Sequence, residues 1–193
     1  MCNNYGVKVS WSQYLDAFTQ IGLDLVAPDG APNLEPQENI WPTEVAPIIR
    51  ASPGGGAELV RMRWGFQPLR PKAGPIINFR TEGRRFTHGR CLAPASHFFE
   101  FTGTRSPKSK WKFTSKHDEW FCIAAIYRQS AGDYPESYSL LTLEPGPDVA
   151  KLHQRQIAIL ERSQWRDWLD PRVPSESLLA PSPEGSLALE RIR

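Results

Sequence analysis

Short runs of alternating apolar and polar residues dominate this chain of 193 residues. Alternation with a period of two is typical of strands buried on one face, and short unbroken apolar runs are typical of strands buried on both. These runs predict extended segments at residues 3–10, 44–51, 58–64, 76–80, 90–101, 111–114, 120–127, 138–143 and 157–160. The Pro-Gly-Gly-Gly cluster at 53–56 predicts a turn that joins two of them into a hairpin.

Helical patterns are few. Ser10 with Gln13 three residues later forms a capping-box pattern, and apolar residues follow at helical spacing until Gly22. Residues 147–152 predict one helical turn, and residues 163–169 a short helix that ends before Pro171. We expect an irregular loop at 25–43, and a weak helical stretch with a Pro-rich turn in the tail from about residue 173.

Many short strands with few helices favour an α+β fold. We expect one domain over residues 1–193, with a mostly antiparallel, barrel-like β core and a few peripheral helices. The composition agrees, because 40% of the residues are hydrophobic and 23% are charged, as in ordinary globular proteins.

Other features narrow the class of protein. No apolar run reaches the ~18 residues of a membrane span, and no basic-then-apolar leader is present. Cys2, Cys91 and Cys122 are too widely spaced for a disulfide framework or a metal pattern. We therefore expect a cytoplasmic protein with no membrane partner, no metal and no organic cofactor. Cys91 and Cys122 lie in apolar runs and are predicted to be buried.

Charge is unevenly distributed along the chain. Residues 61–117 hold thirteen Lys or Arg and two acids, although the whole chain has a net charge of only +2. Aromatic residues interleave these charges, and single-stranded nucleic acid can stack its bases on aromatic rings while basic side chains hold its backbone. We expect a surface that binds a polyanion; a solvated basic face without a partner is the alternative.

Cys2 directly follows the initiator Met1. Removal of methionine is favoured before a small residue, so we expect a mature chain that carries an α-amine and a thiol on adjacent carbons. This pair can capture an aldehyde, since the amine forms an imine and the thiol then closes a thiazolidine ring. It can also serve an N-terminal-nucleophile hydrolase, in which the amine activates the thiol. An ordinary N-terminus without chemistry is the third interpretation.

Two proton carriers are candidates. Glu100 lies among Phe98, Phe99 and Phe101, where burial would raise its pKa towards that of a general acid or base. Strand alternation that turns Glu100 to solvent is the alternative. His153 follows a predicted helical turn and could shuttle protons beside Glu100, or it could be an ordinary satisfied histidine.

Two further polar residues share a short segment. Asn78 follows two isoleucines, and Arg80 projects from the same face if the segment is extended. An amide beside a guanidinium suits a sugar next to a phosphate. A turn-forming asparagine and a surface arginine are the alternatives.

Together these residues resemble the SRAP family (SOS response-associated peptidase, or abasic-site processing proteins). The matching blocks are Met1-Cys2, Trp64-Gly65-Phe66 with Pro68, Asn78-Phe79-Arg80-Thr81-Glu82, Arg90-Cys91-Leu92-Ala93-Pro94-Ala95 before Phe99-Glu100, Thr142, and His153-Gln154-Arg155 before Ile159-Leu160. One block alone would be weak, but the blocks occur in one order through most of the chain.

The resemblance implies a protein that senses abasic sites in single-stranded DNA, or near single-strand/double-strand junctions, in the DNA damage response. It implies Cys2 as the nucleophile that forms a thiazolidine crosslink, and Glu100 as the acid or base that assists ring opening and imine formation. His153 would be a second proton carrier in lyase or reversal activity, and Asn78 would orient the sugar or the Cys2 terminus.

The resemblance also implies a basic DNA groove. The DNA-binding residues would be Arg80 and Arg155 at the flanking phosphates, Trp64 and Thr142 along the DNA path, and Arg84 and Arg85 of the basic segment. The chain departs from the usual pattern at Asn3-Asn4, where Gly-Arg is common, so one phosphate contact is missing or supplied elsewhere.

Two other functions remain open at this point. One is an N-terminal-nucleophile cysteine peptidase, whose minimum role is to remove its own Met1. The other is a non-covalent single-stranded DNA-binding module in which Cys2 is incidental. We expect a monomer, which is associated with the nucleoid when it binds DNA.

Overall fold

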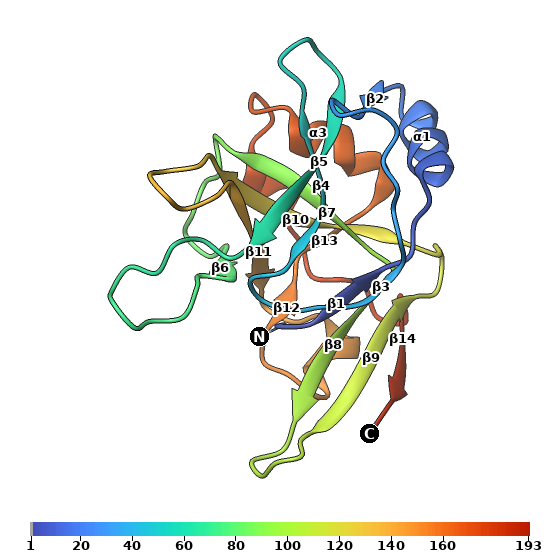
Figure 1. The fold of residues 1–193 in the computed structure, drawn as a ribbon. Coiled ribbons are helices and arrows are strands. Elements are labelled where there is room, and N and C mark those ends of the chain that lie inside the picture. The colour runs from blue at the N-terminus through green and yellow to red at the C-terminus, as the bar shows by residue number, and fades with distance from the viewer. Residues whose placement is uncertain (1) are drawn as a thin grey trace.

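Strands form most of the regular structure, as the alternating pattern predicts (Figure 1). The structure is a computed structural model that describes residues 2–193. Its strands are β1 (Tyr5–Val7), β2 (Leu25–Val26), β3 (Gln37–Ile40), β4 (Val45–Ala51), β5 (Ala57–Trp64), β6 (Asn78–Arg80), β7 (Arg90–Ala95), β8 (His97–Thr102), β9 (Ser109–Ser115), β10 (Phe121–Arg128), β11 (Ser137–Leu143), β12 (Gln156–Ile157), β13 (Ile159–Leu160) and β14 (Leu187–Arg191). Its helices are α1 (Trp11–Gln20), α2 (Pro147–Ala150) and α3 (Trp165–Leu169), with short 3-10 helices η1 (Arg162–Gln164) and η2 (Ser175–Ser177).

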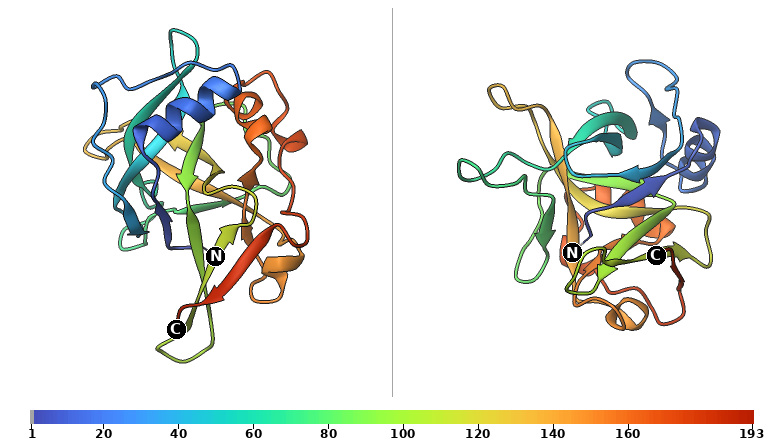
Figure 2. Two further views of the ribbon diagram at one scale, coloured as in Figure 1. Left: turned by 90° about the vertical axis from the view of Figure 1, so that its right-hand side faces the viewer. Right: turned by 60° about the horizontal axis from the view of Figure 1, so that its bottom comes forward.

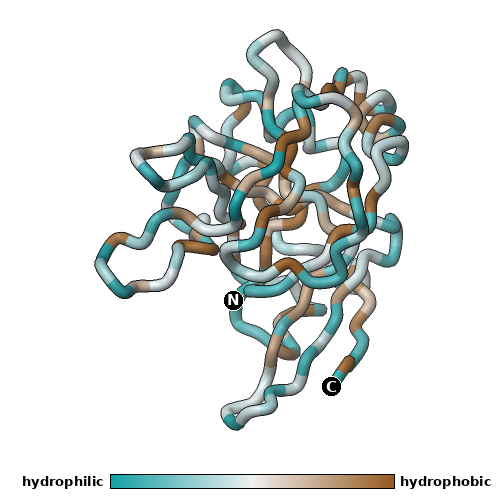
Figure 3. Tube along the Cα trace, viewed as in Figure 1, coloured by the Kyte–Doolittle hydropathy of each residue, from teal (hydrophilic) through white to brown (hydrophobic). Residues whose placement is uncertain are grey.

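Five strands close into a ring at the centre of the fold. They run in the order β5-β4-β7-β10-β11, and β11 pairs back to β5 through Ser137 with Arg63 and Tyr138 with Trp64. Among the described strands, parallel pairing is confined to β2–β5, β5–β11 and β6–β11. Hydrophobic positions gather in these central strands, and hydrophilic ones at the loops (Figure 3). The α+β fold with a mostly antiparallel, barrel-like core is confirmed.

A second sheet of five strands carries the N-terminus, in the order β14-β9-β8-β1-β3. Its β8–β9 hairpin extends away from the ring, with β14 alongside it (Figure 1). Strand β1 is an interior strand of this sheet, since it pairs with β3 on one side and β8 on the other. Cys2 therefore lies close to where the second sheet meets the ring.

The helices lie at the periphery of the sheets (Figure 2). Helix α1 has the predicted capping box, in which the Gln13 backbone N–H donates to Ser10 and the Ser10 N–H donates to the Gln13 side chain. Cys91 and Cys122 are fully buried, as predicted. In the part of the chain that the structure describes, no helix is long and apolar enough to span a membrane.

Several predicted elements differ from the structure. The expected segment at 157–160 is divided between β12 and β13, whereas the expected helical stretch in the tail corresponds to η2. Residues 90–101 form two strands, because the chain turns at Ser96 and passes from the ring into the second sheet, where the Ser96 N–H donates to the Gly6 carbonyl over 2.8 Å. The expected loop at 25–43 contains β2 and β3. The tail contributes β14, which pairs with β9 over five residues. Each of these strands is defined by a partner that is distant in sequence, so no local pattern shows it.

Candidate active site

Cys2 is buried at the start of the second sheet, with 1% of its surface exposed. Its thiol donates to the Asn4 carbonyl over 3.4 Å, and its own carbonyl accepts a hydrogen bond of 2.7 Å from the Asn78 side-chain amide. Because β6 carries Asn78 and pairs with β11, the ring holds the Cys2 backbone from one side. The expectation that Met1 is removed concerns a residue outside the described part of the chain and stays a prediction.

Glu100 lies in β8 and is 2% exposed. Burial raises the pKa of its carboxyl to about 7, so the predicted desolvation is confirmed and strand alternation does not turn this side chain to water. Burial, assisted by the negative charge of Glu100, also raises the pKa of the Cys2 thiol well above its ordinary value. The two groups are thus electrostatically coupled inside one site.

His153 joins this pair from the segment after α2. Its Nε2 lies 3.7 Å from Glu100 Oε2, and its Nδ1 lies 2.9 Å from the Arg155 carbonyl oxygen and 3.1 Å from the Arg155 N–H. Burial lowers the pKa of the imidazole, so His153 is mostly neutral at pH 7 while Glu100 is close to half-protonated. This arrangement can pass a proton between a carboxyl and an imidazole.

Glu100 and His153 open onto one pocket of about 470 Å³. Its described lining residues come from the N-terminus, the residue after β3, the β8–β9 hairpin, the segment after α2 and the end of the chain: Asn3, Trp41, Glu100, Phe101, Ser106, Pro107, Lys108, His153 and Arg193. A pocket of this size, with a few convergent polar groups, suits a small ligand.

Arg155 is partly buried and is held by protein groups. Its guanidinium forms a bidentate pair with Glu82, at 2.5 and 3.0 Å, and donates to the Thr142 carbonyl over 2.7 Å. The same residue's backbone fixes His153, so the Glu82 pair supports the imidazole through Arg155. The predicted phosphate contact of Arg155 would require Glu82 to be displaced.

The structure corrects two predicted DNA contacts. Trp64 and Thr142 are fully buried, so neither lines a DNA path on the surface. Trp64 donates from its indole N–H to the Ile77 carbonyl over 3.0 Å and supports the chain just before Asn78. The Thr142 hydroxyl donates to the Phe79 carbonyl over 3.2 Å and ties β11 to β6. Both residues act as supports of the site.

Arg80, Arg84 and Arg85 are exposed, as a DNA-binding role requires. Arg84 lies over the Phe79 ring at 5.8 Å, and Arg85 forms an exposed ion pair with Glu176 at 3.0 Å. These three residues follow Asn78 closely in the chain, so a basic surface adjoins the Cys2 site.

Sequence reasoning missed several residues of the site. Glu82 is one of only two acids in the basic segment, and that isolation was an available signal for an ion-pair partner. Asn4 is fully buried and donates to the Ile40 carbonyl over 3.3 Å, which its neighbours in the sequence do not indicate. Trp41 lies in the expected loop, where no pattern pointed to a pocket.

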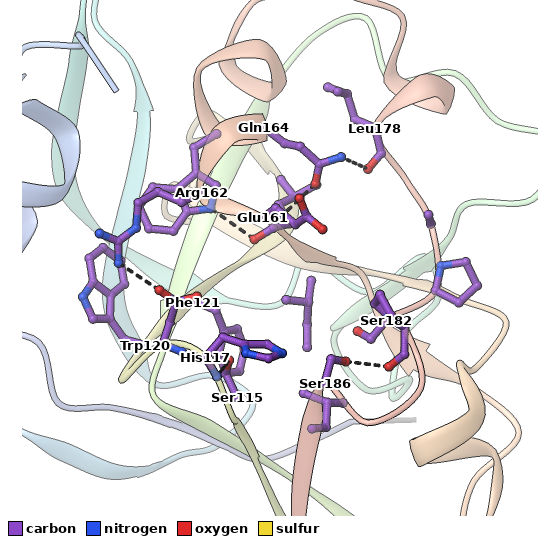
Figure 4. A pocket seen from close by; sticks show the side chains of 18 of the residues that line it. Ser115, His117, Trp120, Phe121, Glu161, Arg162, Gln164, Leu178, Ser182 and Ser186 are labelled. Carbon is purple, nitrogen blue, oxygen red and sulfur yellow. Dashed lines mark hydrogen bonds and ion pairs between the residues drawn. The ribbon is translucent and has the colours of Figure 1, made fainter. Parts of the chain in front are cut away.

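A second cavity, of about 490 Å³, lies elsewhere in the fold (Figure 4). Residues 115–121, 159–165 and 178–187 contribute its walls, and it shares no lining residue with the Glu100 pocket. Its polar side chains bond to neighbouring protein groups: Gln164 donates to the Leu178 carbonyl, and Arg162 to Gln20 and Asp118. Within residues 2–193, no three His, Cys, Asp or Glu side chains are grouped so that they could hold a metal ion.

Fold and site together define a class: a small α+β protein with a cysteine near its N-terminus, beside a carboxyl–imidazole pair. Residues 1–193 match the SOS response associated peptidase (SRAP) family, and the chain belongs to this family.

Three relatives have similar sequences. The abasic site processing protein YoaM of Bacillus subtilis is 27% identical to this chain, over 94% of this chain and 86% of its own. The abasic site processing protein YobE of the same organism is 26% identical, over 94% of this chain and 89% of its own. The abasic site processing protein YoqW of Bacillus phage SPbeta is 26% identical, over 94% of this chain and 87% of its own.

Solved structures share the fold. A protein of Bordetella bronchiseptica superimposes with a TM-score of 0.74 at 21% identity and covers 100% of both chains. A protein of Bacteroides thetaiotaomicron gives a TM-score of 0.75 at 19% identity, over 100% of this chain and 92% of that one.

Proposed function

We propose that this protein captures abasic sites in single-stranded DNA as a covalent thiazolidine adduct of Cys2. The observation that carries the proposal is the buried Glu100, with a pKa of about 7, 3.7 Å from His153 and coupled to the Cys2 thiol. The names of the relatives support abasic DNA as the substrate.

Ring opening is the first step. An abasic deoxyribose is mostly a closed hemiacetal, so its hydroxyl must lose a proton while the ring oxygen gains one. Glu100 near half-protonation can do either, and neutral His153 can exchange the second proton with it. The product is a free aldehyde at C1′.

Capture follows in two steps. The Cys2 α-amine attacks C1′ and the hydroxyl leaves as water with a proton from Glu100, which gives an imine. The thiol then adds to the imine carbon, and its proton moves to the nitrogen by way of the Glu100 carboxylate. Because the raised pKa keeps the thiol protonated, the amine reacts first. The closed ring removes the imine that would drive strand cleavage by β-elimination.

DNA binding would come from the exposed Arg80, Arg84 and Arg85, with phosphates held next to the lesion. Asn78 orients the reacting terminus through its bond to the Cys2 carbonyl. We place this activity in the cytoplasm, on single strands or at their junctions with duplex, and carried out by a monomer.

A cysteine peptidase is the second candidate, because the family's description names one. Acyl transfer by cysteine needs a thiolate, and burial keeps the Cys2 thiol protonated. The same protonated thiol suits aldehyde capture, where the amine acts first. We therefore rank the peptidase below the capture of abasic sites.

The test uses protein whose intact mass shows that the chain begins at Cys2. Incubated with a single-stranded oligonucleotide that holds one abasic site, it should give an adduct that survives heat and detergent, and an undamaged oligonucleotide should give none. The Cys2→Ala variant should give no stable adduct. Peptide turnover without an adduct would favour the peptidase, and equal binding of both oligonucleotides without an adduct would favour a non-covalent binding module.

A further inference from the structure

The cavity of about 490 Å³ takes no part in the capture of an aldehyde, but its lining is that of a binding site (Figure 4). Trp120, Phe121, Leu160 and Trp165 line it, and each is 5% exposed or less. The rings of Trp120 and Trp165 lie 4.9 Å apart. These four residues give the cavity an apolar floor, which suits an apolar side chain or a small apolar group.

One wall of the cavity is held in place from behind. Residues 180–186 form this wall and are mostly exposed. The buried Asp148 carboxylate accepts from the Gly185 and Leu187 N–H groups, each over 3.1 Å, and the buried Gln156 side chain donates to the Ser182 hydroxyl over 2.6 Å. The cavity is therefore formed before a ligand arrives, which lowers the entropic cost of binding.

The rim of the cavity is acidic. Among the described residues that line it, Asp118, Glu161 and Glu184 are acids, against one arginine, Arg162, and one histidine, His117. Arg162 already donates to Asp118 over 3.4 Å. The exposed Glu161 and Glu184 therefore leave an excess of negative charge at the rim, which favours a ligand that carries cations.

The chain itself presents a loop with matching chemistry. Residues 67–75 lie between β5 and β6 and project from the body of the protein (Figure 1, Figure 2). Within the described residues, Leu69 is the most exposed large apolar residue, at 83%. Arg70 and Lys72 follow it and are exposed as well. An apolar side chain beside two cations is complementary to an apolar floor with an acidic rim.

This loop is also ordered. Phe66 and Ile76 close its base, since each donates from its N–H to the carbonyl of the other, over 3.0 and 3.1 Å. Pro68 and Pro71 flank Leu69-Arg70, and each proline fixes its own φ and restricts the residue before it. The loop therefore loses little backbone freedom when it binds.

We infer that the cavity receives the 67–75 loop of a second copy of this chain, with Leu69 on the apolar floor and the cations of the loop beside Glu161 and Glu184. Loop and cavity are different surfaces, so the contact is heterologous and lines up copies head to tail. The inference goes beyond the capture of abasic sites and does not rest on it.

The contact is weak by construction. An interface made by one loop belongs to the small class, below ~1,200 Å², which is typical of transient association. The free protein is then a monomer at low concentration, and one copy holds all the groups that the proposed capture uses. Copies bound along one DNA strand meet at a high effective concentration, where a weak contact is formed.

The test uses two variants that each disable one half of the contact. Leu69→Ser removes the apolar side chain of the loop, and Glu184→Lys reverses a charge at the rim of the cavity. In sedimentation over a series of protein concentrations without DNA, wild-type protein should associate, and each variant alone about 10-fold more weakly. An equimolar mixture of the two should form dimers that do not grow, because one variant keeps an intact cavity and the other an intact loop.

Leu15→Ser and Asp29→Lys are the matched controls, because both residues are exposed and lie outside the loop and the cavity. They should associate like the wild type, and thermal unfolding shows that every variant is folded. Wild-type protein that stays monomeric at all concentrations, variants that associate as well as the wild type, or a mixture that stays monomeric would each overturn the inference. No DNA is present, so these outcomes leave the capture of abasic sites to its own test.

Discussion

At the scale of residues, the fold shifts the pKa values of Glu100 and His153 in opposite directions. Burial raises the pKa of the carboxyl to about 7 and lowers that of the imidazole. A carboxyl that titrates near neutral pH, beside a mostly neutral imidazole, can then exchange protons with reacting groups.

This exchange predicts a bell-shaped pH dependence of adduct formation. As the pH rises, the rate should increase while the Cys2 amine loses its proton, near a pKa of ~7.7–8.0. The rate should decrease while the Glu100 carboxyl loses its proton, at a pKa of about 7. Glu100→Gln should slow the reaction by about 100-fold or more and remove the alkaline limb. Single-turnover rates between pH 5.5 and 9 measure this, and Glu190→Gln, on the surface of β14, is the matched control. An unchanged alkaline limb in Glu100→Gln would exclude Glu100 as the acid.

The sequence predicts the surroundings of some site residues and not of others. The three phenylalanines around Glu100 left two interpretations open, a buried carboxyl and a carboxyl turned to solvent. The structure shows that the Glu100 side chain is buried. Trp64 and Thr142 were predicted to meet DNA, but their hydrogen bonds to Ile77 and Phe79 depend on strand pairings that the sequence does not show. Glu82 could not be paired with Arg155 for the same reason.

At the scale of elements, β1 joins Cys2 to the second sheet. Its Gly6 passes so close to its neighbours that an added Cβ would lie 2.4 Å from the His97 ring and 2.6 Å from the Glu38 carbonyl. Strand β1 can lie between β3 and β8 only because this residue has no side chain.

Gly6→Ala should therefore destabilise the protein, because β3 or His97 must move to make room. We expect the midpoint of thermal unfolding to fall by about 4 °C or more. Gly54→Ala is the matched control, since an added Cβ there meets nothing within 4 Å. Equal midpoints for the two variants would contradict the tight packing of β1.

The elements themselves were largely predictable where the pattern was local. The capping box placed α1, and alternation placed the β4–β5 hairpin. The division of residues 90–101 between two sheets was not predicted, because both strands are buried and only Ser96 and His97 interrupt the apolar residues at the turn. Strand β14 likewise exists through its pairing with β9.

At the scale of the whole molecule, basic charge adjoins the Cys2 site on two sides. Arg80, Arg84 and Arg85 are exposed next to Asn78, and Lys108 and Arg193 line the pocket from the hairpin side. The uneven charge along the chain predicted a polyanion partner, and the fold brings both basic groups close to one site.

This distribution predicts a salt-dependent affinity for DNA. Each phosphate contact contributes about −0.7 to the slope of log K against log salt for single strands. Arg80→Ala should reduce the magnitude of the slope by about that amount and weaken binding of all sequences alike. Arg166→Ala, an exposed arginine of α3, should leave the slope unchanged. Equal slopes for the two variants would remove Arg80 from the DNA contact.

The central claim is that the amine and the thiol of Cys2 together hold C1′ of the abasic sugar. Mass spectrometry of the adduct, formed without a reductant and digested to peptides, tests it most directly. We predict that the sugar is attached to the peptide that begins with Cys2, with a mass equal to the sum of both parts less one water, and that Cys2→Ser gives no such stable product. Attachment at any other residue, or an adduct seen only after reduction, would contradict the claim.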